Sequence, residues 1–469
     1  MLTTLLLLIS CASVPDKAID TSPAATTTDS TPPTTTTTPP TTPPSQRPPL
    51  WFGGAAPPSN IFILSIDTLR RDHLTRWGGP GLTPFMDSLV TGGVALDDHV
   101  QCSNWTFASM SCTTLGRPGR DLEWVPQLAG DARRKMPEAG TIPRWLRDEA
   151  GFFTLVNSIN GWFSDEWHTL QGYDRRMGRG PGAEAAIAAA ADSLQDAIAD
   201  GDVQDHWLMH VHVTEPHVPY APPEEYLGAL ADLPPLDWDV TVGEYHYDAT
   251  ATWPSLTTEE QGVLLAHLRA RYEAEVRWLD DQVERAFADL ESRGLLDDTL
   301  VVVYNDHGES FWEHGAQTHA HTLHAQENNG ILFFWSKTLV PGSWSGPTHS
   351  TDLAATLLDL HGVTVPPEVD GLPLGTAPPD RLRFQFSVAR QGVLQAVIQG
   401  DHKLHYDWDD GRLELYDRAT DPDELTDLVT EQTERVDELW EHLRPEVEAL
   451  DPLLEQSPVW PERTGGSTD

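Results

Sequence analysis

Carboxylate and imidazole side chains follow two apolar segments that have the length of β-strands. Asp67 ends the first segment, residues 60–66, and Asp306 and His307 follow the second, residues 299–304. The next residue is a glycine, which has no side chain to block access to the turn. Two carboxylates and an imidazole can hold a catalytic divalent metal ion and leave positions for a nucleophile and a substrate oxygen. We therefore expect Asp67, Asp306 and His307 to bind a metal.

A hydroxyl-rich segment, residues 102–112, supplies a candidate nucleophile. It lies at an expected strand-to-helix junction, where a helix N-terminus offers unpaired N–H groups and a positive dipole end to an anion. We expect Thr106 to attack the substrate, because metal coordination makes an alcohol much easier to deprotonate. A Ser/Thr cluster taken alone is usually a helix cap, so this prediction depends on the metal ligands.

Histidines are concentrated after two of the strand-like segments. His217 follows the segment 206–213, and the loop after Asp306 holds four more, namely His314, His319, His321 and His324. Because imidazole titrates near neutral pH, these side chains could bind substrate oxygens and protonate a leaving group. A separate zinc site and an ordinary polar surface are two other interpretations of the loop. The sequence of the loop does not decide between these three interpretations.

The order of apolar strands and amphipathic helices predicts an α/β fold. Three strand-like segments deliver polar residues at their carboxyl ends, where open parallel sheets place their ligand sites. The apolar spacing predicts helices over residues 183–199, 257–292 and 351–361. The helix at 257–292 opens with the capping pattern Thr257-Thr-Glu-Glu260.

A second, smaller unit is expected near the C-terminus. After a proline-rich break at 364–380, short alternating segments at 393–398, 403–406 and 414–417 and a helix at 431–449 predict an antiparallel sheet capped by a helix. We therefore expect a catalytic domain over residues 51–380, an α+β subdomain over 381–450 and a tail over 451–469.

The N-terminal residues predict a lipid-anchored protein of the cell envelope. Residues 1–11 are an apolar run that ends in Leu8-Ile-Ser-Cys11 and resembles the lipobox of bacterial lipoproteins, with Cys11 as the lipidated residue. The run is shorter than the ~20 residues of a spanning helix. Residues 12–50, rich in Thr, Pro, Ser and Ala, predict an extended linker. The protein is expected to face the periplasm or the cell exterior and to contact the membrane only through its N-terminal lipid.

The chain is strongly acidic. Its 30 Lys and Arg residues stand against 72 Asp and Glu residues, which gives a formal charge of −42. These numbers exclude nucleic acid and anionic membrane surfaces as partners. A site for an anionic ester needs local positive charge from a metal ion, histidine or arginine. Apart from Cys11, the cysteines are Cys102 and Cys112, and the sequence leaves open whether these two form a disulfide.

Nine segments carry a resemblance to a known family along residues 59 to about 445. They are Asn60–Leu74, Thr83–Leu89, Gly93–Val94, His217–Tyr220, Arg271–Gln282, Asn305–Glu309, Glu313–Gly315, His349–Asp359 and Leu413–Glu424. In this order they resemble the sulfatase family of the alkaline-phosphatase superfamily. The resemblance implies an alkaline-phosphatase-like α/β/α sandwich with a large mixed, mostly parallel sheet, followed by a small C-terminal antiparallel sheet and a helix.

The resemblance also implies roles for individual residues. It implies one divalent metal ion held by Asp67, Asp306 and His307 together with the nucleophile Thr106. Its substrate-binding positions correspond to His217, His319 and Trp105, and the two histidines are the candidates for protonating the leaving group. Arg70 is expected to support the site through Asp72 or the backbone.

The nucleophile segment departs from the family's usual pattern. Typical sulfatases carry C/S-x-P-x-R, whose first residue is oxidised to formylglycine, whereas this chain has Thr106, Ala108 and Met110 at those places. Threonine cannot become formylglycine, so the chain looks closer to the threonine branch of phosphodiesterases, phosphatases and phosphoethanolamine transferases. Thr68 replaces the second aspartate of the usual calcium site. With the imidazole of His307, this favours zinc or manganese over calcium.

The expected function is metal-dependent hydrolysis of sulfate or phosphate esters of small molecules, glycans or lipids, through a covalent ester on Thr106. One alternative is a phosphoryl-group transferase acting on an envelope lipid or glycan. The other is a non-catalytic, anion-binding surface lipoprotein, because the family's arginine and proline are missing beside Thr106.

Overall fold

The computed structural model describes residues 48–118, 136–236, 238–241, 245–389 and 392–455. The expected signal segment 1–11 with Cys11, and the expected linker 12–50 up to residue 47, lie outside the described residues. Within the described ranges, no helix combines the length and the apolar character needed to cross a membrane.

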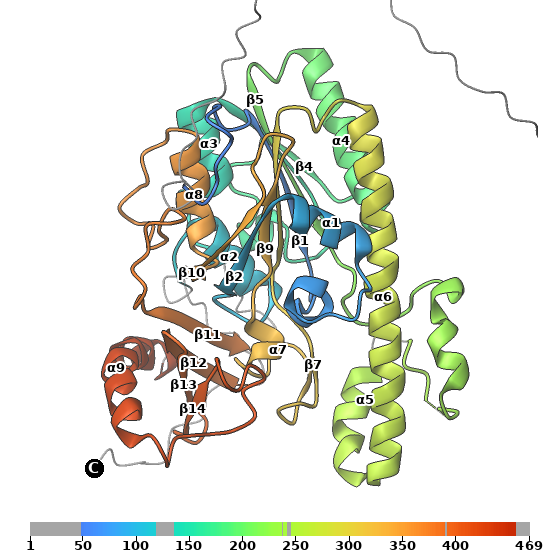
Figure 1. Cartoon of the computed structure of the whole chain (residues 1–469), viewed down its shortest axis with the longest axis vertical. Coiled ribbons are helices and arrows are strands. Elements are labelled where there is room, and N and C mark those ends of the chain that lie inside the picture. Colours follow the sequence, from blue (N-terminus) through green and yellow to red (C-terminus); the bar gives the residue numbers. More distant parts are fainter. Residues whose placement is uncertain (1–47, 119–135, 237, 242–244, 390–391, 456–469) are drawn as a thin grey trace, which may run out of the picture. The chain divides into compact units, whose positions relative to one another are not determined.

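An eight-stranded sheet forms the middle layer of the structure (Figure 1). Its strands, in spatial order, are β10 (Gly342–His349), β2 (Val94–Val100), β9 (Leu332–Trp335), β6 (Thr299–Asn305), β1 (Asn60–Ile66), β5 (His206–Val213), β3 (Phe152–Asn157) and β4 (Arg175–Met177). Strand β9 runs antiparallel to both of its neighbours, and the other adjacent strands pair in parallel. The expected large mixed, mostly parallel sheet is therefore confirmed.

Helices cover both faces of this sheet. In β1, Phe62 and Leu64 pack into one apolar cluster, and Ile61 and Ile63 pack into the cluster on the opposite face. The first cluster includes α1 (Pro84–Gly92), α4 (Ala183–Asp200) and α6 (Thr258–Ser292). The second includes α2 (Thr106–Leu115), α3 (Ile142–Ala150) and α8 (Asp352–Leu360). Since both faces are covered, the architecture is the α/β/α sandwich predicted from the sequence.

Helix α6 begins where its capping pattern predicts. The Thr257 hydroxyl accepts a hydrogen bond from the Glu260 N–H at 3.3 Å, and the Glu260 carboxylate accepts one from the Thr257 N–H at 2.7 Å. Other short elements include α5 (Tyr245–Thr252), α7 (Ala325–Asn328), β7 (Ser310–Phe311) and β8 (Gln317–Thr318).

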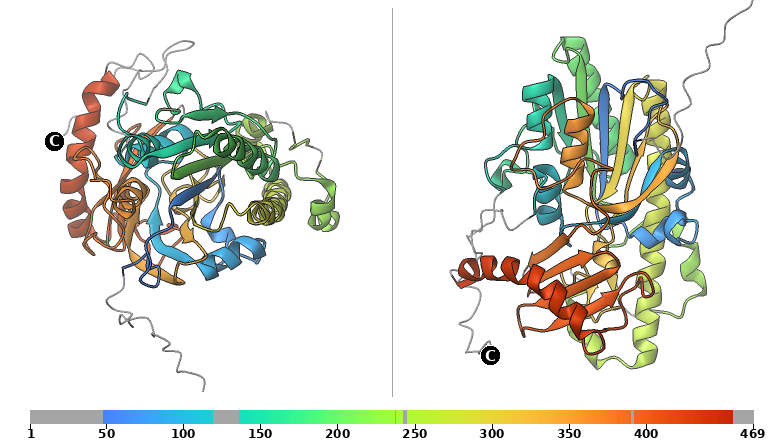
Figure 2. Two further views of the ribbon diagram at one scale, coloured as in Figure 1. Left: turned by 90° about the horizontal axis from the view of Figure 1, so that it is seen from above. Right: turned by 60° about the vertical axis from the view of Figure 1, so that its left-hand side comes forward.

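A four-stranded antiparallel sheet and a long helix form the C-terminal part, at one end of the central sheet (Figure 2). The strands follow chain order as β11 (Arg383–Ala389), β12 (Gly392–Gln399), β13 (His402–Asp407) and β14 (Leu413–Asp417), and the helix is α9 (Thr433–Glu455). Strand β11 was not predicted, and α9 continues past the expected tail boundary at residue 451. All ten residues of α2 are buried. One side of the helix packs into an apolar cluster with the C-terminal sheet and α9, and Met110 packs into the second apolar cluster of the central sheet.

Candidate active site

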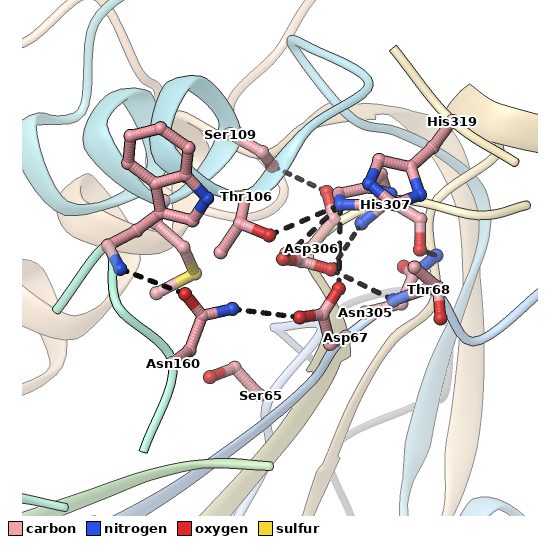
Figure 3. A network of polar contacts seen from close by, with 12 residues as sticks. Ser65, Asp67, Thr68, Thr106, Ser109, Asn160, Asn305, Asp306, His307 and His319 are labelled. Carbon is pink, nitrogen blue, oxygen red and sulfur yellow. Dashed lines mark hydrogen bonds and ion pairs between the residues drawn. The ribbon is translucent and has the colours of Figure 1, made fainter. Parts of the chain in front are cut away.

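The carboxyl ends of neighbouring strands bring the predicted acidic residues together. Strands β1 and β6 are paired in register, with Ile66 beside Asn305, so the residues that follow them lie side by side. Asp67 follows β1, and Asp306 and His307 follow β6; none of the three side chains is measurably exposed. Figure 3 shows these side chains converging on one point.

The three side chains offer a ligand set for one cation. Their ligand atoms all lie within 4.8 Å of one another, and His307 Nε2 is 3.6 Å from both Asp67 Oδ1 and Asp306 Oδ2. Within the described part of the chain, these two carboxylate oxygens are buried and accept no hydrogen bond. Such orphaned anionic oxygens are costly unless a cation pairs with them. The set therefore fits a divalent metal ion.

The backbone around His307 orients its ring toward the two aspartates. His307 Nδ1 lies 2.9 Å from the Gly308 carbonyl oxygen, so Nδ1 carries the proton and Nε2 presents its lone pair to the site. Position 308 admits only glycine, since a Cβ there would lie 1.9 Å from the Gln326 carbonyl oxygen.

Neighbouring groups hold the second oxygen of each aspartate. Asp306 Oδ1 accepts hydrogen bonds from the backbone N–H groups of Thr68 at 3.2 Å and His307 at 2.8 Å. Asp67 Oδ2 accepts one from Asn160 Nδ2 at 2.9 Å and lies 3.6 Å from His212 Nε2. Each carboxylate is thus oriented on one side and left open on the side that faces His307.

Thr106 is the first residue of α2 and points into the same site (Figure 3). Its Oγ1 lies 3.4 Å from His307 Nε2 and can donate a hydrogen bond to it. The Ser109 hydroxyl donates to the Asp306 carbonyl oxygen at 2.5 Å and ties α2 to the end of β6. Cys102 and Cys112, which the sequence left undecided, form a disulfide that brackets Thr106.

Trp105 precedes Thr106 and belongs to an aromatic cluster beside the candidate nucleophile. The Trp105 ring centroid lies 5.6 Å from that of Phe107 and 5.3 Å from that of Trp162. Trp167 completes the cluster, 4.8 Å from Trp162. An apolar wall therefore flanks the polar site, as in most small-molecule sites.

The histidine-rich loop separates into two groups. His319 Nδ1 lies 3.0 Å from Glu309 Oε1, and its ring centroid is 4.5 Å from that of His307 and 4.9 Å from that of His217. His217 and His319 therefore join the candidate site. By contrast, His314 and His324 stack on each other with centroids 3.6 Å apart, and His324 contacts the C-terminal sheet.

Burial and mutual repulsion shift the pKa values of the acidic residues. Burial and the Asp67 carboxylate raise the pKa of Asp306 to about 8, and burial raises the pKa of Glu309 to about 7. Burial opposes ionisation of His217, but the Asp67 and Glu309 carboxylates outweigh it and raise the His217 pKa. Without a cation, the two aspartates thus retain a proton near neutral pH. A bound metal ion would supply the positive charge that this proton supplies.

Arg70 is engaged by protein groups, as expected from the sequence. Its guanidinium donates to Asp72 at 3.0 and 2.6 Å, to Glu313 at 2.7 Å and to the Glu309 carbonyl oxygen at 3.0 Å. The Tyr272 hydroxyl continues this support by donating to the Thr68 carbonyl oxygen and accepting from the Arg70 N–H, both at 2.7 Å. Arg70 therefore positions the turns that carry Asp67 and Glu309.

The sequence reasoning missed Asn160 and His212. Asn160 follows β3, whose apolar run ends in polar residues in the same way as β1 and β6. That pattern could have identified it. His212 lies inside β5, which reads as an apolar strand. Its Nδ1 and His210 Nε2 each lie 2.9 Å from the Ser65 hydroxyl, a contact between strands that the sequence does not reveal.

Known proteins resemble this chain in sequence and in fold. The sequence model of the family described as Sulfatase matches residues 59–363. Choline-sulfatase of Rhizobium meliloti is 25% identical over 258 residues, which are 51% of this chain and 49% of that protein. The chain thus matches about half the length of this curated relative.

Solved structures share the fold over most of both chains. One, of a protein in complex with its substrate D-glucosamine-2-N,6-O-disulfate, has a TM-score of 0.65 at 18% identity and covers 86% of this chain and 100% of its own. The phosphonate monoester hydrolase of Silicibacter pomeroyi has a TM-score of 0.61 at 20% identity and covers 84% of this chain and 95% of its own. These similarities identify the fold as alkaline-phosphatase-like.

Proposed function

The chain belongs to the sulfatase family, and from that premise we propose that it is a metal-dependent hydrolase of sulfate or phosphate esters that acts through Thr106. One observation carries the proposal. The hydroxyl of Thr106, at the start of a buried helix, meets the unsatisfied ligand set of Asp67, Asp306 and His307. A nucleophile, a cation site and a helix N-terminus at one point are the parts that ester transfer to an alcohol requires.

Each residue has a defined task in this reaction. Thr106 Oγ1, after its proton has passed to solvent, attacks phosphorus or sulfur in line with the leaving oxygen. The bond to the leaving oxygen breaks, and water then hydrolyses the threonyl ester that has formed. His319, held by Glu309, or its neighbour His217 donates a proton to the leaving oxygen. A divalent ion held by Asp67, Asp306 and His307 would supply the positive charge that stabilises the transition state.

The threonine favours phosphorus esters as substrates. The chemistry of formylglycine is unavailable to Thr106, so the enzyme must resolve an ordinary threonyl ester. The fold that it shares with a phosphonate monoester hydrolase adds phosphonates to the candidates, and choline-sulfatase adds small sulfate esters. We propose phosphate and phosphonate esters first and sulfate esters second, with zinc or manganese as the ion.

A lipid anchor at Cys11 is part of the same proposal. It would place the enzyme in the cell envelope, with the linker 12–50 between the lipid and the domain at 51–380. Sulfate or phosphate esters of glycans and lipids at the cell surface would then be within reach.

A non-catalytic, anion-binding role is the second candidate, and one contact favours it. Met110 stands where the resemblance places an arginine, and its sulfur accepts a hydrogen bond from the Tyr304 hydroxyl at 3.4 Å. That position therefore gives the substrate no positive charge. A binding protein could keep the cation site without turnover.

Hydrolysis by the metal-loaded protein separates these functions. An aryl sulfate, an aryl phosphate, a phosphodiester and a phosphonate monoester would be compared after loading with zinc or manganese, with Asp306→Asn as the control that removes a metal ligand. We expect turnover of at least one phosphorus ester and its loss in Asp306→Asn. Binding of phosphate without turnover of any ester would favour the non-catalytic role.

A further inference from the structure

Two histidines and a glutamate that the proposed reaction does not use meet at the C-terminal sheet. His324 precedes α7 in the catalytic part, whereas His405 lies on β13 and Glu414 on β14. His405 and Glu414 are direct cross-strand partners in the antiparallel pair. Their side chains therefore project from the same face of the sheet, where opposite Cβ atoms are about 5 Å apart. The sheet itself holds two potential ligands side by side.

The third side chain reaches this pair from a distant part of the sequence. The three ligand atoms of His324, His405 and Glu414 lie within 4.8 Å of one another. His324 Nε2 is 3.8 Å from Glu414 Oε2, and the two imidazole centroids are 4.6 Å apart. Ligands of a tetrahedral zinc ion lie roughly 3.4 Å from each other, so the His324 and Glu414 atoms are already close to that separation.

Buried ring nitrogens in this cluster lack hydrogen-bond partners. The side chains of His324 and His405 are 9% and 8% exposed, and among the described residues His324 Nδ1 and His405 Nε2 make no hydrogen bond. An unsatisfied nitrogen in a buried cluster calls for an explanation, and for His405 Nε2 an ion is one.

The other polar groups near this cluster either pair with another residue or are oriented so that they cannot bind the same ion. Glu424 lies 3.7 Å from His405 Nε2, but Lys403 donates to it at 3.1 Å and balances its charge. The His314 ring is parallel to that of His324 within 4° and 3.6 Å away. Because a metal lies in the plane of each imidazole that binds it, two parallel rings this close cannot share one ion. The Tyr416 hydroxyl lies 3.2 Å from His324 Nε2, and this is the hydrogen-bond contact that an ion at that nitrogen would replace.

We propose that His324, His405 and Glu414 bind a divalent transition-metal ion such as zinc, at a site that shares no residue with the candidate active site. Two imidazoles and one carboxylate are an established zinc ligand set. The ion joins the loop that carries His319 to β13 and β14. It therefore stabilises the packing of the C-terminal sheet on the catalytic part and is independent of the proposed hydrolysis.

Zinc stoichiometry of the purified protein tests this site. Zinc would be counted by atomic spectroscopy after dialysis of wild type, Glu414→Gln and His405→Gln, with Glu434→Gln on the exposed surface of α9 as the matched control. We expect each of the two ligand variants to bind one equivalent fewer than wild type and the control to bind the same number. Asp306→Asn should lose a different equivalent, so failure of the catalytic site and failure of this site are distinguishable.

Thermal unfolding provides the second readout. Added zinc should raise the unfolding temperature of Asp306→Asn and should have no such effect when Glu414→Gln is combined with it. Glutamine keeps the shape of Glu414, and Glu414 lies on the last strand of its sheet, so we expect Glu414→Gln to fold. This variant therefore tests the zinc site even if the buried His405→Gln fails to fold. Undiminished zinc in Glu414→Gln, or no zinc bound by Asp306→Asn, would overturn the proposal.

Discussion

At the scale of single residues, Asn160 acts on the candidate metal site through Asp67. Its amide donates to Asp67 Oδ2 and leaves Oδ1 directed toward His307. Such supporting groups typically contribute 10- to 100-fold in metal affinity or activity. We expect Asn160→Ala to lower the affinity for zinc or manganese by roughly that factor, measured by competition with a chromophoric chelator. Ile159→Ala, on the same loop and 48% exposed, is the control, and equal affinities in the two variants would contradict the assignment.

The site could be predicted from the sequence only where one strand end carried the signal. Asp67, Asp306 and His307 each follow a strand that is recognisable by itself, and Thr106 starts a helix beside a hydroxyl-rich segment. His212 acts through contacts between strands that are distant in sequence, whereas Asn160 follows β3 and could have been identified from the same strand-end pattern. The separation of the histidine loop, with His319 in the site and His324 on the C-terminal sheet, likewise depends on tertiary packing.

At the scale of elements, α6 carries a carboxyl group that is buried against the loop after β5. Glu275 accepts a hydrogen bond from the Ala221 N–H at 2.9 Å, and burial together with the nearby Glu215 raises its pKa to about 8. The folded protein therefore keeps this proton at neutral pH, whereas the unfolded chain, with an ordinary pKa of 4.5, releases it. The contribution that this carboxyl makes to the free energy of unfolding is fully present below about pH 4.5. It is therefore lost as the pH rises toward 8.

We expect Glu275→Gln to remove this pH dependence, because its amide stays neutral and can still accept from Ala221. Wild type should lose stability relative to the variant by up to about 1.4 kcal/mol for each pH unit between the two pKa values. Thermal unfolding from pH 5 to pH 8.5 measures the difference. Glu284→Gln, exposed on the same helix, is the control. A constant difference between wild type and Glu275→Gln across this range would show that the carboxyl is ionised in the folded state.

The disulfide between Cys102 and Cys112 closes a short loop around the start of α2. By chain entropy, a loop of this length contributes about 3 kcal/mol to the free energy of unfolding. We expect the double variant Cys102→Ala/Cys112→Ala to be destabilised by roughly that amount and to lose activity, because Thr106 would be held less firmly. Denaturant unfolding and turnover would be measured together. Unchanged kcat/KM would show that the helix alone positions Thr106.

The strands that the sequence failed to predict depend on partners elsewhere in the chain. Strand β2 carries Asp97, Asp98 and His99, a run that does not read as a buried strand. In the structure, Asp98 accepts hydrogen bonds from Arg383 at 2.8 Å and Arg418 at 3.2 Å. Strands β1, β5 and β6 were predictable because each consists largely of consecutive apolar residues, which indicate a buried strand.

At the scale of the whole molecule, the net negative charge of the protein should repel the anionic ester that the site itself attracts. The formal charge of −42 repels an anionic ester at long range, and salt screens that repulsion beyond about 8–10 Å. We expect kcat/KM for an aryl phosphate to rise several-fold between roughly 20 and 200 mM salt. A zwitterionic ester such as phosphocholine or choline sulfate, whichever is turned over, should respond less. A fall of kcat/KM with salt for the anionic ester would indicate a positively charged approach to the site.

The fold and the family were predictable over most of the chain, because ordered strands, helices and motifs all pointed to one architecture. The packing of α2 between the two sheets was not predictable, because the ten residues of this helix have the hydroxyl-rich sequence of an ordinary helix N-terminus. This packing holds Thr106 in place and joins the C-terminal sheet to the catalytic part.

The central claim is that Thr106 is the nucleophile of a metal-dependent reaction. The most direct measurement compares turnover and bound metal in wild type, Thr106→Ala and Thr106→Ser on the best ester of the panel. We expect Thr106→Ala to lose at least about 10³-fold in kcat with its metal content unchanged, and Thr106→Ser to retain measurable turnover because it keeps a hydroxyl. Turnover by Thr106→Ala at the wild-type rate would contradict the account.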